Sequence, residues 1–145
     1  MRSYRLYPAL VLMACGGDWL TGPGTPLDLS HQSLQGRWVN VSVVHTLVAN
    51  PSIAYRFERS PDEGEIVEFD GSGGVQHSRY PPDVTYTSPT YTITGDTLRM
   101  ELAYVAEVST TRLELTLAER VTHDFDGDGD QEEAVEVSTY QRGKD

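Results

Sequence analysis

Apolar and polar residues alternate through most of the chain after residue 36, which is the pattern of half-buried β-strands. The clearest stretch is 112–117, where Leu113, Leu115 and Leu117 are separated by charged or polar residues. The same two-residue period recurs at 39–43, 55–58, 98–102 and 135–138. No segment sustains the 3.6-residue period of an amphipathic helix, so the pattern predicts an all-β domain.

Turn residues separate these strands at short intervals. Residues 70–74 (DGSGG) and the Gly95–Asp96 pair each join two apolar segments, which predicts β-hairpins. Ser30 is suited to cap a short helical turn that Gly36 ends. Outside the Gly/Pro-rich segment 15–30, the longest irregular stretch is 80–89, where Tyr80 and Tyr86, together with Tyr91, form either the rim of an opening or part of a proline-stiffened connector.

The pattern yields eight or nine short antiparallel strands in sequential hairpins. A meander of this size can close into a small β-barrel, and closure removes the exposed strand edges. A β-sandwich has similar strand spacing and stays open as the alternative architecture.

The N-terminus predicts an export signal. Arg2 and Arg5 precede a short apolar run, and that run ends at Ala14 before Cys15, the single cysteine. The run is too short to span a bilayer. Residues 12–15 (LMAC) resemble the lipobox of bacterial lipoproteins, which implies lipidation of Cys15 and an outer-membrane anchor, with the domain in the periplasm or on the cell surface. The alternative is a buried cysteine in an N-terminal strand.

These features divide the chain into a signal peptide (1–14), a Gly/Pro-rich flexible tether (15–30) and one β domain (31–145). Removing residues 1–14 leaves 9 basic and 22 acidic side chains, a formal charge of −13. An acidic surface of this kind argues against nucleic acid and anionic lipid headgroups as partners and favours a cation. One cysteine cannot form a disulfide within the chain.

Seven of the 22 acidic residues lie between 124 and 136, and their spacing predicts a calcium loop. Side-chain oxygens at loop positions 1, 3 and 5, a glycine at position 6 and a carbonyl at position 7 are the usual calcium ligands. Val135 occupies loop position 12, where a calcium loop usually has a bidentate glutamate, so the last ligand would be the earlier residue Glu132. The alternative is an acidic hairpin tip. The predicted calcium ligands, for a structural ion, are Asp124, Asp126, Asp128, Asp130 and Glu132.

Short motifs at both ends of the domain resemble the lipocalin-like domains of bacterial lipoproteins. Gly36 and Trp38 form a Gly-x-Trp sequence at the first strand, and Tyr140 and Arg142 form an aromatic-x-Arg sequence at the last. The resemblance implies a barrel plugged by Trp38, and we expect Arg142 to lie over its indole ring as a cation–π partner.

No histidine pair, nucleophile elbow or phosphate-binding loop is present in the sequence, and we expect no enzymatic activity. The expected function is binding of a small apolar or amphipathic molecule inside the barrel. The alternative is a filled barrel that acts as a structural or interaction module and contacts another envelope protein. The predicted ligand-binding residues are Tyr55, Phe57, Phe69, Tyr91 and Met100.

Overall fold

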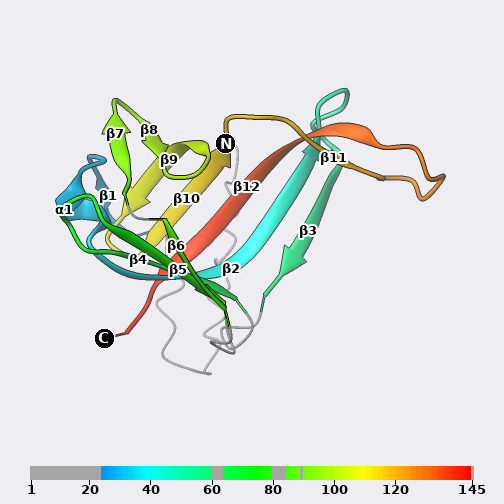
Figure 1. Cartoon of the computed structure of the whole chain (residues 1–145). Coiled ribbons are helices and arrows are strands. Elements are labelled where there is room, and N and C mark those ends of the chain that lie inside the picture. The colour runs from blue at the N-terminus through cyan, green and yellow to red at the C-terminus, as the bar shows by residue number, and fades with distance from the viewer. Residues whose placement is uncertain (1–23, 60–63, 80–83, 89, 145) are drawn as a thin grey trace, which may run out of the picture.

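The computed structural model describes residues 24–59, 64–79, 84–88 and 90–144, and they form a strongly curled antiparallel sheet (Figure 1). One short helix, α1 (His31–Leu34), precedes the long strand β2. The strands are β1 (Pro26–Leu27), β2 (Gly36–Leu47), β3 (Ala54–Glu58), β4 (Glu65–Phe69), β5 (Val75–Arg79), β6 (Val84–Ser88), β7 (Thr92–Thr94), β8 (Thr97–Arg99), β9 (Ala103–Ser109), β10 (Arg112–Leu117), β11 (Val121–His123) and β12 (Glu132–Arg142).

The two longest strands, β2 and β12, pair with each other and connect two parts of the molecule. The main path of the sheet runs β6-β5-β4-β2-β12-β10-β9-β8-β7. The first half of β2 pairs with β4 and its second half pairs with β3, while β11 pairs with the start of β12. Every pairing among the described strands is antiparallel, as the hairpin pattern predicts.

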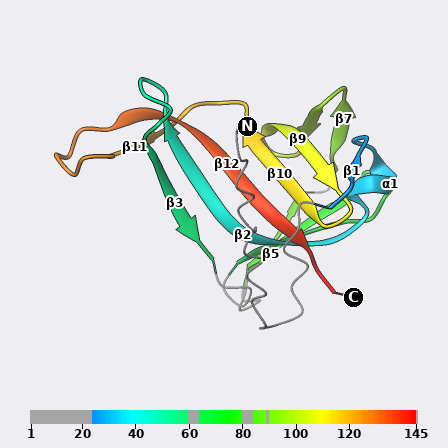
Figure 2. The ribbon, with the colours of Figure 1, turned by 180° about the vertical axis from the view of Figure 1, so that it is seen from behind.

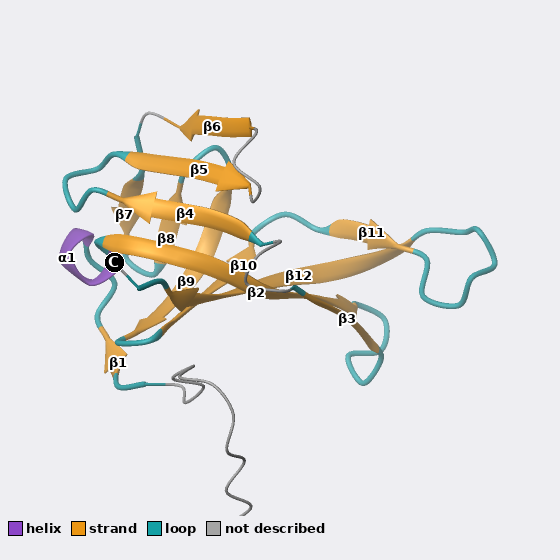
Figure 3. Ribbon diagram, turned by 90° about the horizontal axis from the view of Figure 1, so that it is seen from below, coloured by secondary structure: helices purple, strands orange, loops and turns teal. Residues whose placement is uncertain are grey.

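We call the curled part, formed by α1, β1, β4–β10, residues 36–41 of β2 and residues 138–142 of β12, the barrel region. In Figure 3 its sheet curls so that β4, β5 and β6 face β7 and β8 across the interior. The extension comprises β3, β11, residues 42–47 of β2, residues 132–137 of β12 and the loop between β11 and β12. Its strands pair in the order β3-β2-β12-β11. Figures 1 and 2 show it projecting from the barrel region as a narrow sheet.

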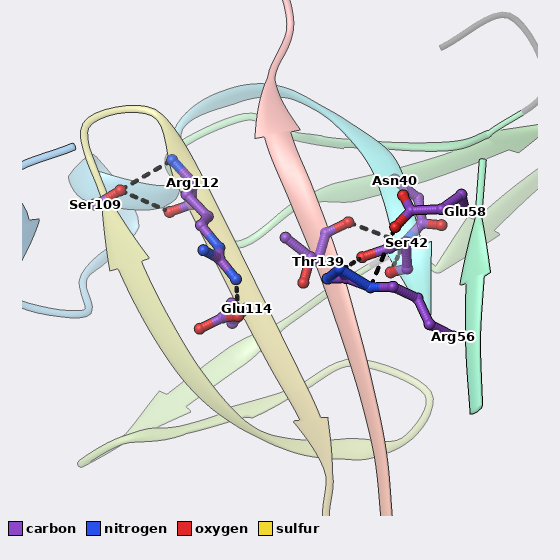
Figure 4. Close-up of polar contacts among 8 residues, drawn as sticks. All are labelled: Asn40, Ser42, Arg56, Glu58, Ser109, Arg112, Glu114 and Thr139. Carbon is purple, nitrogen blue, oxygen red and sulfur yellow. Dashed lines mark hydrogen bonds and ion pairs between the residues drawn. The ribbon is translucent and has the colours of Figure 1, made fainter. Parts of the chain in front are cut away.

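A β-bulge marks the junction between these regions. The pairing of β12 with β2 shifts between Thr139 and Tyr140, because Asn40 lies opposite Tyr140 whereas Ser42 lies opposite Thr139. The Asn40 side-chain amide donates to the carbonyls of Ser42 and Thr139 at 3.3 and 3.2 Å, which satisfies acceptors that the irregular ladder leaves open (Figure 4). A bulge of this kind bends and twists a sheet, consistent with the change of direction at this point.

The hydrophobic core lies inside the barrel region. Fully buried residues from β2, β4, β8 and β10 pack with α1, and Trp38, Phe69 and Leu98 are among the largest. The predicted helical turn is confirmed: Ser30 caps α1, accepting a 3.1 Å hydrogen bond from the backbone N–H of Ser33. The hairpins expected at 70–74 and Gly95–Asp96 also form, as β4–β5 and β7–β8.

The structure corrects part of the expected strand pattern. The stretch 80–89 was expected to be irregular, yet Val84–Ser88 forms β6, because its β-branched and aromatic residues suit a strand between flanking prolines. Tyr80 lies outside the described residues, as does the side chain of Tyr86. Within the expected tether, Pro26 and Leu27 pair with β9, so the folded domain begins at or before Pro26.

The described strands form a half-barrel, and the closed barrel expected from the sequence is not seen in them. Along the same part of the chain, no helix has the length and apolar character needed to cross a membrane.

Candidate functional site

The four residues of the terminal motifs gather at one end of the barrel region. Trp38 is fully buried, and its indole N–H donates to the carbonyl of Leu34 at 2.7 Å. The Arg142 guanidinium lies 4.1 Å from the centre of the indole ring, which is the contact expected from the sequence. Gly36 has a φ of 110°, and a Cβ there would approach the guanidinium at 3.4 Å. Tyr140 is buried two residues before Arg142.

The Arg142 side chain also bonds the backbone of two neighbouring elements at this end of the sheet. Its guanidinium donates to the carbonyls of Gln35 at 2.8 Å, Ser33 at 2.9 Å and Thr110 at 3.0 Å. These bonds satisfy carbonyls at the end of α1 and in the β9–β10 turn, which a helix end and a turn leave open. Trp38 and Arg142 therefore hold α1, the β9–β10 turn and the last strand together, and we call these two residues the plug of the barrel region.

The five predicted ligand-binding residues fall into two separate groups. Phe69 and Tyr91 are buried in the core, in ring contact at 5.0 Å between centroids, and Met100 packs against the same core from a partly buried position. Tyr55 and Phe57 lie on β3 in the extension, with 49% and 36% of their surfaces exposed. The structure thus does not bring all five residues together: three lie in or against the core and two lie on β3.

Tyr55 and Phe57 belong to a group of five rings that we call the aromatic cluster, in which these two are exposed and the other three are partly buried. His123 occupies its centre, with ring centroids 4.9 Å from Tyr55, 5.2 Å from His45 and 4.8 Å from Phe125. Tyr55 and Phe57 contact each other at 4.6 Å, and Phe57 reaches His45 at 5.4 Å. The members of the aromatic cluster are His45, Tyr55, Phe57, His123 and Phe125.

Strand register explains how residues distant in sequence form this cluster. Tyr55 lies opposite His45, and His45 lies opposite Glu136, so the three side chains share one face of the extension. On the same face, Phe57 lies opposite Val43 and Val43 opposite Ser138. Ser138 in turn lies opposite Leu115 of β10, whose side chain is buried in the core. The aromatic cluster therefore continues the concave face that forms the interior of the barrel region.

A set of titratable side chains reaches from the core at Tyr140 to the aromatic cluster at His45. Glu65 contacts His77 at 2.9 Å and accepts a 3.3 Å hydrogen bond from the Tyr140 hydroxyl. Glu136 contacts His45 at 2.9 Å. Burial raises the pKa of Tyr104 to about 12, and the Glu65 and Glu136 carboxylates add to that shift. Burial also raises the pKa of Tyr140 well above its usual 10. We call these six side chains the polar belt.

The predicted calcium loop forms a compact turn beyond the aromatic cluster. Carboxylate oxygens of Asp124, Asp126 and Asp128 lie within 4.8 Å of one another. The Asp124 carboxylate accepts hydrogen bonds from the backbone N–H groups of Gly127 and Gly129, at 2.6 and 3.0 Å. Both glycines have positive φ, which a side chain would strain.

The remaining two predicted calcium ligands have other contacts. The backbone N–H of Asp130 donates to Asp128 at 2.8 Å, and Glu132 accepts a 3.0 Å bond from the backbone N–H of Phe125. Glu132 thus fixes the base of the loop, where it also orients Phe125 toward the aromatic cluster. Three of the five predicted carboxylates come together as a candidate ion site.

A hollow lies beside β1, on the far side of the barrel region from the extension. This cavity of about 670 Å³ is lined by the residues around Leu27, the Gly95–Asp96 turn and the start of β10. The Arg112 guanidinium contacts Glu114 there, while Ser109 binds the Arg112 backbone (Figure 4). Arg112 is thus held by an ion pair along its own strand.

No local sequence pattern indicates that His45, His123 and Phe125 are neighbours. Their proximity depends on the β11–β12–β2 register, which the chain does not encode locally. The alternation at 55–57 was the available signal, since it placed two aromatic rings on one face of a short strand. Cys15 lies outside the described residues.

Comparison with protein-family models, with curated proteins and with solved structures finds no match to this chain.

Proposed function

We propose that this protein is an exported lipoprotein, anchored in the outer membrane through Cys15, whose lipocalin-like domain binds a small apolar or amphipathic molecule. The observation that carries the proposal is the aromatic cluster at the open end of the concave face, with two large rings left exposed. Exposed aromatic groups rimmed by polar residues are typical of binding surfaces.

The order of residues along the concave face supports an amphipathic ligand. Its apolar part would lie against Tyr55 and Phe57, while the polar belt offers carboxylates and histidines deeper on the same face. Beyond the belt, the core around Phe69 and Tyr91 is packed. The proposed ligand therefore occupies the open end and not the depth of a closed barrel.

The packed core is also the observation that favours the alternative, an interaction module with a filled barrel. In that case the same aromatic cluster would contact an envelope protein in place of a small molecule. The two candidate functions predict different results with a small apolar probe. A ligand-binding domain binds the probe with measurable affinity, whereas a filled interaction module does not.

The test is a fluorescence titration of the full chain, carrying Cys15→Ser to remove the lipidation site, with the neutral apolar dye N-phenylnaphthylamine. Replacing Tyr55 and Phe57 by Ala removes apolar contact worth about 1.5–3 kcal/mol per fully buried ring, so we expect affinity to fall at least about tenfold. The matched control is Leu102→Ala, which truncates a similarly exposed apolar side chain (42%) in the β8–β9 turn. No dye binding by the parent protein would favour the module, and equal affinity of both variants would contradict the proposed site.

We further propose that the loop 124–132 holds a structural calcium ion. The grouping of three carboxylates within 4.8 Å supports the proposal, since unneutralised charges at this spacing repel one another. A calcium ion would stabilise the turn that orients Phe125 and connects β11 to β12. Affinity at an exposed extracellular loop of this kind is on the order of 10⁻⁴–10⁻³ M.

Calcium binding predicts a ligand-dependent gain in stability. At about 10 mM calcium, an affinity in that range raises the free energy of unfolding by about 1.4–2.7 kcal/mol. Denaturant unfolding with calcium and with chelator measures this gain, and Asp126→Asn/Asp128→Asn should abolish it. Asp96→Asn, an exposed aspartate in the β7–β8 turn, is the control. Identical unfolding of the parent protein in calcium and chelator would exclude the ion.

A further inference from the structure

We infer that the free edge of β3 pairs with β3 of a second copy of this chain, joining the two extensions into one continuous antiparallel sheet. Among the strands that the structure describes, β3 pairs with β2 alone, and all five of its residues are exposed. An exposed strand edge with unpaired backbone groups is a template for further pairing.

The hydrogen bonds to β2 show which backbone groups face this edge. The N–H of Leu47 donates to Ile53 O, and the N–H of Arg59 donates to Val41 O. Bonded and non-bonded pairs alternate along an antiparallel ladder, so Tyr55 and Phe57 also bond to β2. The N–H and C=O groups of Ala54, Arg56 and Glu58 consequently point away from β2.

Charge selects one register for two copies of this edge. Arg56 and Glu58 lie on the same face of β3, with 3.2 Å between Nε and Oε1 and side chains that are 53% and 70% exposed (Figure 4). When two copies pair about a two-fold axis at Phe57, each Arg56 lies opposite Glu58 of the other copy, forming two cross-strand pairs of opposite charge.

Two neighbouring registers that pair these outward-facing groups lack this complementarity. Centring the axis on Arg56 places two arginines opposite each other, and centring it on Tyr55 places Arg56 opposite Ala54. Like charges directly opposite each other destabilise a sheet. Of these three registers, only the one centred on Phe57 makes the edge self-complementary in charge.

The same register brings the aromatic faces together. Phe57 lies opposite its counterpart as a non-bonded pair, the closer of the two antiparallel pair types, at about 4.5 Å between Cα atoms. Both aromatic clusters then lie on one side of the joined sheet, since a two-fold axis perpendicular to the sheet preserves its faces. Pairing would cover exposed ring surface that the single chain leaves in water.

The test is sedimentation equilibrium of the full chain with Cys15→Ser, which also removes the one thiol that could link two copies. We expect a concentration-dependent dimer. Arg56→Glu and Glu58→Arg should each raise the dissociation constant at least about tenfold, because each places like charges opposite one another twice. The double variant R56E/E58R and an equimolar mixture of the two single variants should both restore association. Glu119→Arg, the same charge change at an exposed turn, should leave it unchanged.

Amide hydrogen exchange provides an independent measurement. In the dimer, the amides of Ala54, Arg56 and Glu58 should become protected as concentration rises, while Tyr55 and Phe57 amides, already bonded to β2, should change little. A monomer at millimolar concentration would overturn the inference. So would a dimer that is insensitive to both charge reversals, or one whose protection lies outside β3.

Discussion

Two pairs of aromatic rings have similar geometry and opposite surroundings in this molecule. Phe69 and Tyr91 in the barrel region meet edge to face at 5.0 Å, with 1% and 3% of their surfaces exposed. Tyr55 and Phe57 in the extension also meet edge to face, at 4.6 Å, yet they are 49% and 36% exposed. In the barrel region, β4, β5 and β6 face β7 and β8 across the interior, whereas the described strands of the extension form a single layer.

This difference separates residues that the fold requires from residues that it does not. Burial of the first pair removes apolar surface from water, which is the main favourable contribution to folding. The second pair stays largely in water and contributes much less. The aromatic character of this second pair fits the proposed contact with a ligand or with a second chain.

The largest expected effect is the difference in stability loss between truncating a buried ring in the barrel region and truncating an exposed ring in the extension. Trp38→Ala removes a fully buried indole, its hydrogen bond to Leu34 and its contact with Arg142, and should lower the free energy of unfolding by about 3–5 kcal/mol. Phe57→Ala should lower it by about 1 kcal/mol or less, because the ring is partly exposed already. Urea unfolding followed by circular dichroism measures both. Equal losses would remove the distinction between the two regions.

A smaller effect is expected from Arg142→Lys, which keeps the charge at the plug of the barrel region. Lysine cannot reproduce the planar fork that bonds Gln35, Ser33 and Thr110 while stacking on Trp38. We expect a loss of about 2 kcal/mol of unfolding free energy by the same measurement. Arg56→Lys in the extension is the matched control, since Arg56 is half exposed and has only an ion pair with the exposed Glu58 and a long 3.5 Å hydrogen bond to Ser42. A loss at Arg142 no greater than at Arg56 would show that the plug is not structural.

The smallest effect is confined to alkaline solution. Burial raises the pKa of Tyr104 to about 12, so the native state favours its neutral phenol. Its contribution to stability is complete below the unfolded pKa of 10 and is lost as the pH rises through about 12. Tyr104→Phe should therefore reduce the loss of unfolding free energy over that interval, measured by urea titration at each pH. The same loss in both proteins would show that Tyr104 is not the group responsible.

Much of the barrel region could be predicted from local patterns. The alternation of leucines at 113, 115 and 117 gives β10, and the glycines at 71, 73 and 95 have the positive φ that the two predicted hairpins require. The motif at Trp38 predicted the contact with Arg142, because the two ends of a curled meander are neighbours. These features depend on adjacent residues or on the simplest strand order.

The candidate site could not be predicted in this way, because its residues meet only through the pairing of strands that are distant in sequence. His45, Tyr55 and His123 lie on three different strands, and a one-residue change in any of their registers would move a ring to the opposite face. Phe57 and Phe69 look alike as alternating strand aromatics, yet only Phe69 is buried. Burial is a property of the assembled sheet, so the two groups could not be separated beforehand.

The most direct test of the account is an NMR titration of the ¹⁵N-labelled full chain, carrying Cys15→Ser, with N-phenylnaphthylamine. If the open end of the concave face is the binding surface, amide shifts will concentrate on β3, on residues 43–47 of β2 and on β11. The amides around Phe69, Tyr91 and Trp38 will stay unchanged. Shifts centred on that core, or none at a dye concentration that saturates the fluorescence signal, would contradict the proposed site.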